Sequence, residues 1–171
     1  MKQIRISDVT MKQALALSFK EKIELSKLLD KLGVTVIELE PLVQAKIDAL
    51  RIKSVAAAVK NSIVAVPVAL DSENVRLTWN ALKEAQHPRL QVCAPVSPVQ
   101  MEYLYHVKAP QMLEKITALV TTAKTFCPDV ELVIRDATRA EEGFAAKCAK
   151  TAEDAGAAAI TLCDDSGAFF P

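Results

Sequence analysis

The sequence feature that most constrains the fold is a strand–helix–strand pattern over residues 130–167. Residues 131–134 form a short, mostly apolar run of the kind that is buried on both faces of a parallel sheet. A second apolar run covers residues 159–163. Between the two runs, apolar side chains recur every three or four residues, as on one side of a helix: Phe144, Cys148, Ala152 and Ala155. Because parallel strands need a crossover connection, the pattern predicts a β-α-β unit.

An earlier segment repeats part of this unit. Residues 30–40, DKLGVTVIELE, align with residues 153–163, EDAGAAAITLC, helix end over helix end and strand over strand. Such repetition is typical of a layered or barrel α/β protein. The whole chain gives six predicted strands, each after the first preceded by a helix, at residues 4–7, 34–39, 63–69, 90–94, 131–134 and 159–163. We predict that these strands are parallel neighbours in chain order, with the helices outside, in one domain that covers residues 1–171.

Local signals place the ends of the first helix. Ser18 with Glu21 three residues later is a capping box, and Gly33 stands where a left-handed residue would end the helix. Residues 95–110 contain three prolines and form the longest irregular connection, interrupted by a short turn of helix at residues 99–103. Long connections of this kind often carry functional residues.

Charge and composition exclude several classes of partner. Lys plus Arg equals Asp plus Glu at 21 each, and like charges form no run, so we expect neither nucleic acid nor membrane as a partner. The longest apolar stretches are too short to span a bilayer, and the start of the chain lacks a signal pattern, so we expect a cytoplasmic protein. The four cysteines form no CxxC pair, which favours reduced core thiols over a metal or redox site.

Five segments, in order along the chain, resemble motifs of the isopropylmalate synthase and homocitrate synthase family. The segments are ISDVTMKQ, LGVTVIELE, VSPVQMEY, RDATR and CDDSGAFFP, which stand where that family has a DTTLRDGxQ-like loop, a VIE strand, TSPIHMEY, EDATR and DTxGxxxP. The resemblance implies a (β/α)8 TIM-barrel fold. A complete barrel needs about 250 residues, so this sequence covers about six of the eight βα units.

The resemblance also implies a function. Family members are acyltransferases of amino-acid biosynthesis that condense acetyl-CoA with a 2-oxo acid, so these two small molecules are the expected partners. Lys12 stands where the family has an arginine that polarises the oxo group, and Glu38 matches a family glutamate, so both are catalytic candidates. Four more residues at strand or loop ends are substrate-binding candidates: Gln13, Ser97, Asp136 and Asp164. We expect a homo-oligomer, because a six-stranded arc leaves two open sheet edges.

The chain departs from the family at residues that carry chemistry. Gln13 stands where the family has the aspartate that binds a divalent metal (Mg, Mn or Zn), and it offers a neutral carbonyl oxygen, a weaker ligand for a hard cation. Arg135 replaces an acid, and Asp165 replaces a threonine that helps to hold the substrate carboxylate. The family's paired metal-binding histidines lie beyond Pro171. We therefore assign no metal ligand and expect no tight metal binding. A non-catalytic, barrel-derived binding or assembly protein is the alternative.

Overall fold

The sheet consists of six parallel strands whose spatial order follows the chain. The computed structural model describes residues 4–13 and 16–167. Neighbouring strands pair in parallel throughout, in the order β1 to β6. The strands are β1 (Ser7–Asp8), β2 (Val36–Glu38), β3 (Ile63–Val68), β4 (Pro88–Pro95), β5 (Val130–Arg135) and β6 (Ala159–Leu162). This confirms the predicted order, and it excludes a doubly wound sheet, in which the strand order reverses after the first strand.

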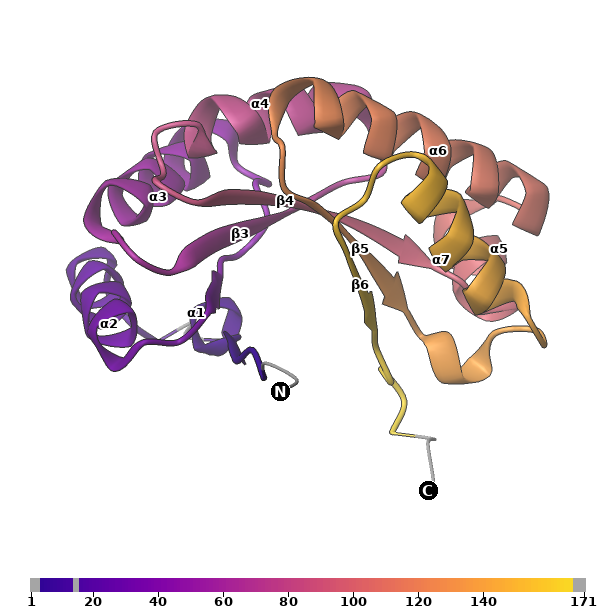
Figure 1. Ribbon diagram of the computed structural model, residues 1–171, viewed down its shortest axis with the longest axis horizontal. Coiled ribbons are helices and arrows are strands. Elements are labelled where there is room, and N and C mark those ends of the chain that lie inside the picture. Colours follow the sequence, from indigo (N-terminus) through magenta and orange to yellow (C-terminus); the bar gives the residue numbers. More distant parts are fainter. Residues whose placement is uncertain (1–3, 14–15, 168–171) are drawn as a thin grey trace.

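The long helices that connect the strands lie on the convex side of the curled sheet, whereas the short α1 (Thr10–Gln13) lies inside the arc and carries Lys12 to the concave side (Figure 1). The other helices are α2 (Phe19–Leu32), α3 (Ala45–Ala58), α4 (Ser72–Leu82), α5 (Pro98–Tyr105), α6 (Ala109–Phe126) and α7 (Phe144–Asp154), with a 3₁₀ turn, η1 (Ala137–Arg139). Figure 1 shows α3, α4 and α6 over one face of the sheet, with β1 and β6 at the two ends of the arc. The other face of the sheet lines the concavity. The described part of the chain is therefore an open section of a (β/α) barrel.

Strands β4 and β5 show why one face of the sheet packs against helices and the other can carry a site. Successive side chains of a strand point to opposite faces, and in β4 the apolar Leu90, Val92 and Ala94 are all fully buried. They lie on the helix side, where α6 supplies the buried Met112 and Ile116. Fully burying one such large side chain contributes roughly 1.5–3 kcal/mol. The alternate positions of β4 and β5 are therefore free to carry polar residues toward the concave side.

The predicted elements differ from the observed ones mainly at the edge of the sheet and after β4. The capping box of Ser18 and Glu21 is present, and Gly33 ends α2 in the left-handed region at φ 83°. The first strand was predicted at residues 4–7, but only Ser7–Asp8 pairs with β2. The turn predicted at residues 99–103 is an eight-residue helix, α5, because Ser97 Oγ accepts from the backbone N–H of Gln100 and Pro98 is favourable in the first turn.

Among the residues that the structure describes, no helix combines the length and the apolar composition that crossing a membrane requires.

Candidate functional site

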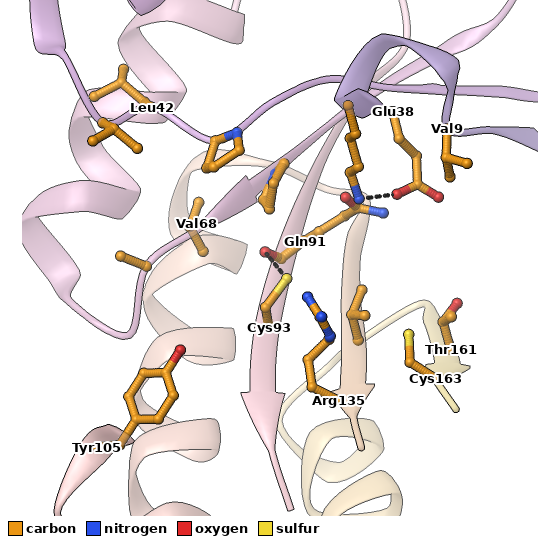
Figure 2. Close-up of a pocket in the computed structure, with 16 residues that line it drawn as sticks. Val9, Glu38, Leu42, Val68, Gln91, Cys93, Tyr105, Arg135, Thr161 and Cys163 are labelled. Carbon is orange, nitrogen blue, oxygen red and sulfur yellow. Dashed lines mark hydrogen bonds and ion pairs between the residues drawn. The ribbon is translucent and has the colours of Figure 1, made fainter. Parts of the chain in front are cut away.

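A pocket of about 580 Å³ opens on the concave face, toward the carboxyl ends of the strands. Figure 2 shows polar and thiol side chains from several strands turned into it. Its polar lining includes Lys12, Glu38, Gln91, Tyr105, Arg135 and Thr161, together with the thiols of Cys93 and Cys163. Apolar side chains from the β2–α3 and β3–α4 connections close one side. Barrel enzymes carry their active sites at this end of the strands, so we name this the concave pocket and take it as the candidate site.

Lys12 and Glu38 meet at the first wall of the concave pocket. Lys12 Nζ donates to Glu38 Oε2, and Ser7 Oγ donates to Glu38 Oε1 over 2.6 Å. Burial raises the pKa of Glu38, but the hydrogen bonds from Lys12 and Ser7 stabilise the carboxylate and hold the pKa below its ordinary value. Glu38 is therefore ionised at neutral pH, and its charge holds the Lys12 ammonium at the pocket wall.

Gln91 links this ion pair to the interior of the sheet. It is only 1% exposed, and its Nε2 donates to Glu131 Oε2 over 3.0 Å. A hydrogen bond from Gln91 also contributes to the lowered pKa of Glu38. Thr161 Oγ1 donates to the other Glu131 oxygen over 2.5 Å, and Arg89 lies 3.6 Å from Glu131. The sequence analysis did not identify Gln91 as a site residue, although a polar residue in the middle of an otherwise apolar strand indicates a functional or buried polar contact.

Arg135 extends from the end of β5 into the concave pocket and is held by Asp165. Its Nε lies 3.1 Å from Asp165 Oδ1 and 2.9 Å from Oδ2. Asp165 Oδ2 also accepts the backbone N–H of Asp136 over 2.7 Å. The hydrogen bond that Arg135 donates to Asp165 raises the pKa of the guanidinium above its ordinary value. Arg135 and Asp165 are the residues at which two segments of this chain differ from the family motifs. In the structure their side chains form an ion pair.

The structure brings two of the six predicted site residues, Lys12 and Glu38, together in the concave pocket. The other four do not line it. Gln13 is exposed at the end of α1, and Ser97 is fully buried and caps α5. Asp136 is also fully buried, and Arg139 binds its carboxylate and lowers its pKa. Asp164 accepts from Thr138 Oγ1 over 2.7 Å and lines a separate hollow of about 510 Å³ beside β6. Their role in substrate binding stays a prediction.

Two of the four cysteines line the concave pocket, which the sequence did not distinguish from core positions. Burial raises the pKa of Cys93 to about 11 and raises the pKa of Cys163 as well. Both thiols are therefore protonated at neutral pH, and a protonated thiol is a poor nucleophile. Cys127 and Cys148 are buried in the core, and all four cysteines are free. The pocket thiols are best described as small lining groups.

The residues of the concave pocket do not fit a catalytic divalent metal. Both Glu38 oxygens already accept hydrogen bonds, and Gln13 lies outside the pocket. Asp8 accepts from the backbone N–H and the hydroxyl of Thr10. Over residues 4–13 and 16–167, no group of three or more His, Cys, Asp and Glu side chains is placed to hold a metal ion. We therefore derive no chemical step through a metal.

Calorimetric titration of the chain with Mn²⁺, Zn²⁺ and Mg²⁺ is expected to give weak or no binding. The reason is that tight sites for such ions use three or four protein ligands, and the concave pocket offers one engaged carboxylate. Changing Gln13→Asp is expected to leave the result unchanged, because residue 13 does not line the pocket. Stoichiometric binding at low micromolar concentration, abolished by Glu38→Gln or Asp8→Asn, would show that the site assembles in a way these contacts do not indicate.

Comparison with known proteins agrees with the sequence motifs. Curated relatives include the 2-isopropylmalate synthases of Lysinibacillus sphaericus (strain C3-41), 31% identical, and of Carboxydothermus hydrogenoformans, 29% identical, each over 172 aligned residues and 98% of this chain. The alignments cover 34% of each relative, so the chain spans about a third of their length.

Solved structures show the same fold. Hydroxymethylglutaryl-CoA lyase from Pseudomonas aeruginosa superposes with a TM-score of 0.71 at 18% identity, over 98% of this chain and 60% of that chain. A phosphonopyruvate hydrolase in complex with oxalate and Mg²⁺ gives a TM-score of 0.61 at 14% identity, over 83% of this chain and 55% of that chain. The HMGL-like family model matches residues 3–171. The chain therefore belongs to the HMGL-like family, with a TIM-barrel type of fold.

Proposed function

We propose that the concave pocket binds a 2-oxo acid and that the protein condenses it with acetyl-CoA, as an acyltransferase. The observation that carries the proposal is the Lys12–Glu38 ion pair at the carboxyl ends of the strands. Relatives named 2-isopropylmalate synthase support this reaction class. The proposal includes a role in amino-acid biosynthesis, a cytoplasmic location, a homo-oligomeric state and a single, partial barrel domain over residues 1–171.

In this proposal each residue of the ion pair has a role. Glu38 is the one carboxylate among the described lining residues, and it is ionised, the state that accepts a proton from the methyl group of acetyl-CoA. The resulting carbanion attacks the carbonyl carbon of the 2-oxo acid. Lys12 donates a hydrogen bond to the oxo oxygen and gives it a proton as the carbon–carbon bond forms. Water then hydrolyses the thioester and releases CoA. The low pKa of Glu38 makes it a weak base, so the positioning of both substrates must supply much of the rate.

A second candidate function is non-catalytic binding of a small acid. It is favoured by the missing metal donor set in the described residues, because Lys12 and Ser7 already donate to both oxygens of Glu38 and Gln13 does not line the pocket. In that case the ion pair serves only to hold the cation at the pocket wall.

Glu38→Gln is expected to lower the rate of CoA release by about a hundredfold or more, since it removes the proton acceptor and the partner of Lys12. The assay incubates the chain with acetyl-CoA and a panel of 2-oxo acids and measures free CoA with a thiol reagent. Glu24→Gln is the matched control, because Glu24 is a solvent-exposed residue on α2 whose one ion pair within residues 4–13 and 16–167 is with Lys27. Absence of CoA release with every acid, while the acids still bind, would reject the acyltransferase and leave the binding function.

A further inference from the structure

Lys12 places a primary amine in the concave pocket. It lies on α1, where its neighbour Met11 is 2% exposed and belongs to the hydrophobic core, so the short helix is fixed against the sheet. Among the described residues that line the pocket, Lys12 carries the one primary amine, and its side chain is 29% exposed, so a ligand can reach it. A lysine amine that has lost its proton can attack a carbonyl carbon and form a Schiff base.

Glu38 is placed to take that proton and to return it. Its Oε2 accepts directly from Lys12 Nζ, and Ser7 Oγ donates to its other oxygen over 2.6 Å. Burial raises the pKa of Glu38, but the hydrogen bonds from Lys12 and Ser7 hold the pKa below its ordinary value. Transfer of a proton from the ammonium to the carboxylate is therefore uphill, and the neutral amine is a minor species. The direct contact nevertheless gives the proton a path that needs no water.

The surroundings of the ion pair favour an imine over the free amine. Val9, Leu42 and Val68 line the same pocket (Figure 2), where they offer contact to an apolar chain and reduce the access of water, which hydrolyses imines. A protonated imine carries the same single positive charge as the ammonium that it replaces. The carboxylate of Glu38 can therefore neutralise the imine as it neutralises the amine, and no charge is left unpaired by the reaction.

We propose that Lys12 is a Schiff-base nucleophile that binds a small aldehyde or ketone covalently in the concave pocket, with Glu38 as the acid and base. Glu38 takes one proton from Nζ, and the neutral nitrogen attacks the carbonyl carbon. A second proton moves from nitrogen to the former carbonyl oxygen, which gives a carbinolamine. Glu38 then returns its proton to the hydroxyl group, water leaves, and a protonated imine remains beside the carboxylate. This inference rests on the proposed function only in using the same two residues.

Reductive trapping of the unmodified chain tests the proposal. The chain is incubated with an equimolar amount of butanal and with cyanoborohydride, which reduces an imine to a stable secondary amine, and peptide mass spectrometry measures the label on each lysine. Lys12 is expected to carry at least tenfold more label than Lys27 or Lys22. Lys27 controls for exposure, because it forms an exposed ion pair with Glu24. Lys22 controls for a buried ion pair, because it is buried and pairs with Glu40 outside the pocket.

A variant of Glu38 tests the acid and base role. Glu38→Gln should lower the label on Lys12 at least tenfold, because an amide can neither take the proton nor return it. Glu24→Gln, which removes the partner of Lys27, should leave the label on Lys12 unchanged. Circular dichroism checks that each variant is folded. A rise in the label on Lys12 in Glu38→Gln would mean that the carboxylate only holds the ammonium in its unreactive form, and it would overturn the proposal.

The outcomes separate this inference from the acyltransferase proposal. Equal label on Lys12 and Lys27 in the unmodified chain also overturns the Schiff-base nucleophile. The release of CoA from acetyl-CoA with a 2-oxo acid is measured separately, without butanal or cyanoborohydride. CoA release without selective trapping at Lys12 would leave the acyltransferase and reject the nucleophile, whereas selective trapping without CoA release would do the reverse.

Discussion

Replacing Asp30→Asn is expected to lower the free energy of unfolding by about 2 kcal/mol at pH 7. Asp30 is buried near the end of α2, and its carboxylate accepts hydrogen bonds from the backbone N–H groups of Lys60, Asn61 and Ser62 over 3.0, 2.9 and 2.7 Å. These hydrogen bonds connect the turn before β3 to α2. An asparagine keeps the size of the side chain, but it has a single oxygen and brings an NH₂ group against three backbone donors.

The pH dependence follows from the sign of the pKa shift. Burial would raise the pKa of Asp30, but the backbone N–H groups of Lys60, Ser62 and Asn61 outweigh it and lower the pKa from 3.8 to about 2. A group with a lowered pKa in the folded state stabilises the protein above its unfolded pKa and loses this effect as the pH falls through its folded pKa. The difference in stability between the unmodified chain and Asp30→Asn should therefore be constant above about pH 5 and shrink between about pH 4 and pH 2.

Urea denaturation at one low protein concentration, followed by circular dichroism from pH 7 to pH 2.5, measures this difference. Asp154→Asn is the control, because Asp154 is exposed at the end of α7 and, in the part of the chain that the structure describes, pairs with the exposed Lys150 alone. It should leave the denaturation midpoint unchanged. A stability difference for Asp30→Asn that is small at pH 7, or that does not shrink in acid, would mean that the buried carboxylate contributes little beyond its shape.

The sheet could be predicted from the sequence because burial on two faces makes its inner strands almost continuously apolar. β3, β4 and β5 were placed within two residues at each end, and so was the apolar edge strand β6; the order of the strands followed from the repeated strand-and-helix unit. The prediction of β1 was less accurate. Ile4 and Ile6 are 87% and 61% exposed, so the alternation of residues 4–7 does not reflect burial in this structure. An edge strand has a single neighbour, which leaves its length less determined by the pattern.

The site was predictable only in part. Lys12 and Glu38 followed from the family motifs, and Glu38 lies at a strand end where parallel strands gather their functional groups. The contact of Arg135 with Asp165 does not follow from either motif alone, because it depends on the two strands being neighbours in the sheet. Arg135 is a base where the family has an acid, and Asp165, after the next strand, is an acid where the family has a threonine. Two such changes after neighbouring strands indicate a new ion pair. Ser97 and Asp136 do not line the concave pocket, since polar residues at strand ends also serve as helix caps and buried ion pairs, and their role in substrate binding stays a prediction.

The open arc leads to the second large prediction, which concerns the ends of the sheet. Among the described strands β6 pairs with β5 alone, and its Ile160 and Leu162 are 37% and 65% exposed. Near the other end of the arc, α2 packs against α3 and β2, and its Leu28 and Leu32 are 62% and 77% exposed. Exposed apolar residues next to unpaired strand edges favour association with another chain, since pairing satisfies the backbone groups and burial removes apolar surface from water.

We therefore expect a preparation of the 171-residue chain to self-associate at tens of micromolar, through edge pairing or exchange of elements that involves β6. The double variant Ile160→Lys with Leu162→Lys should weaken this association by at least a hundredfold, because two charges cannot be buried in an apolar contact without a large desolvation cost. Sedimentation equilibrium over a range of concentrations measures the effect. The control is Leu104→Lys, an equally exposed leucine (67%) on α5, away from the sheet edges. A stable, folded monomer of the unmodified chain, or equal weakening by the control, would show that the β6 edge does not drive association.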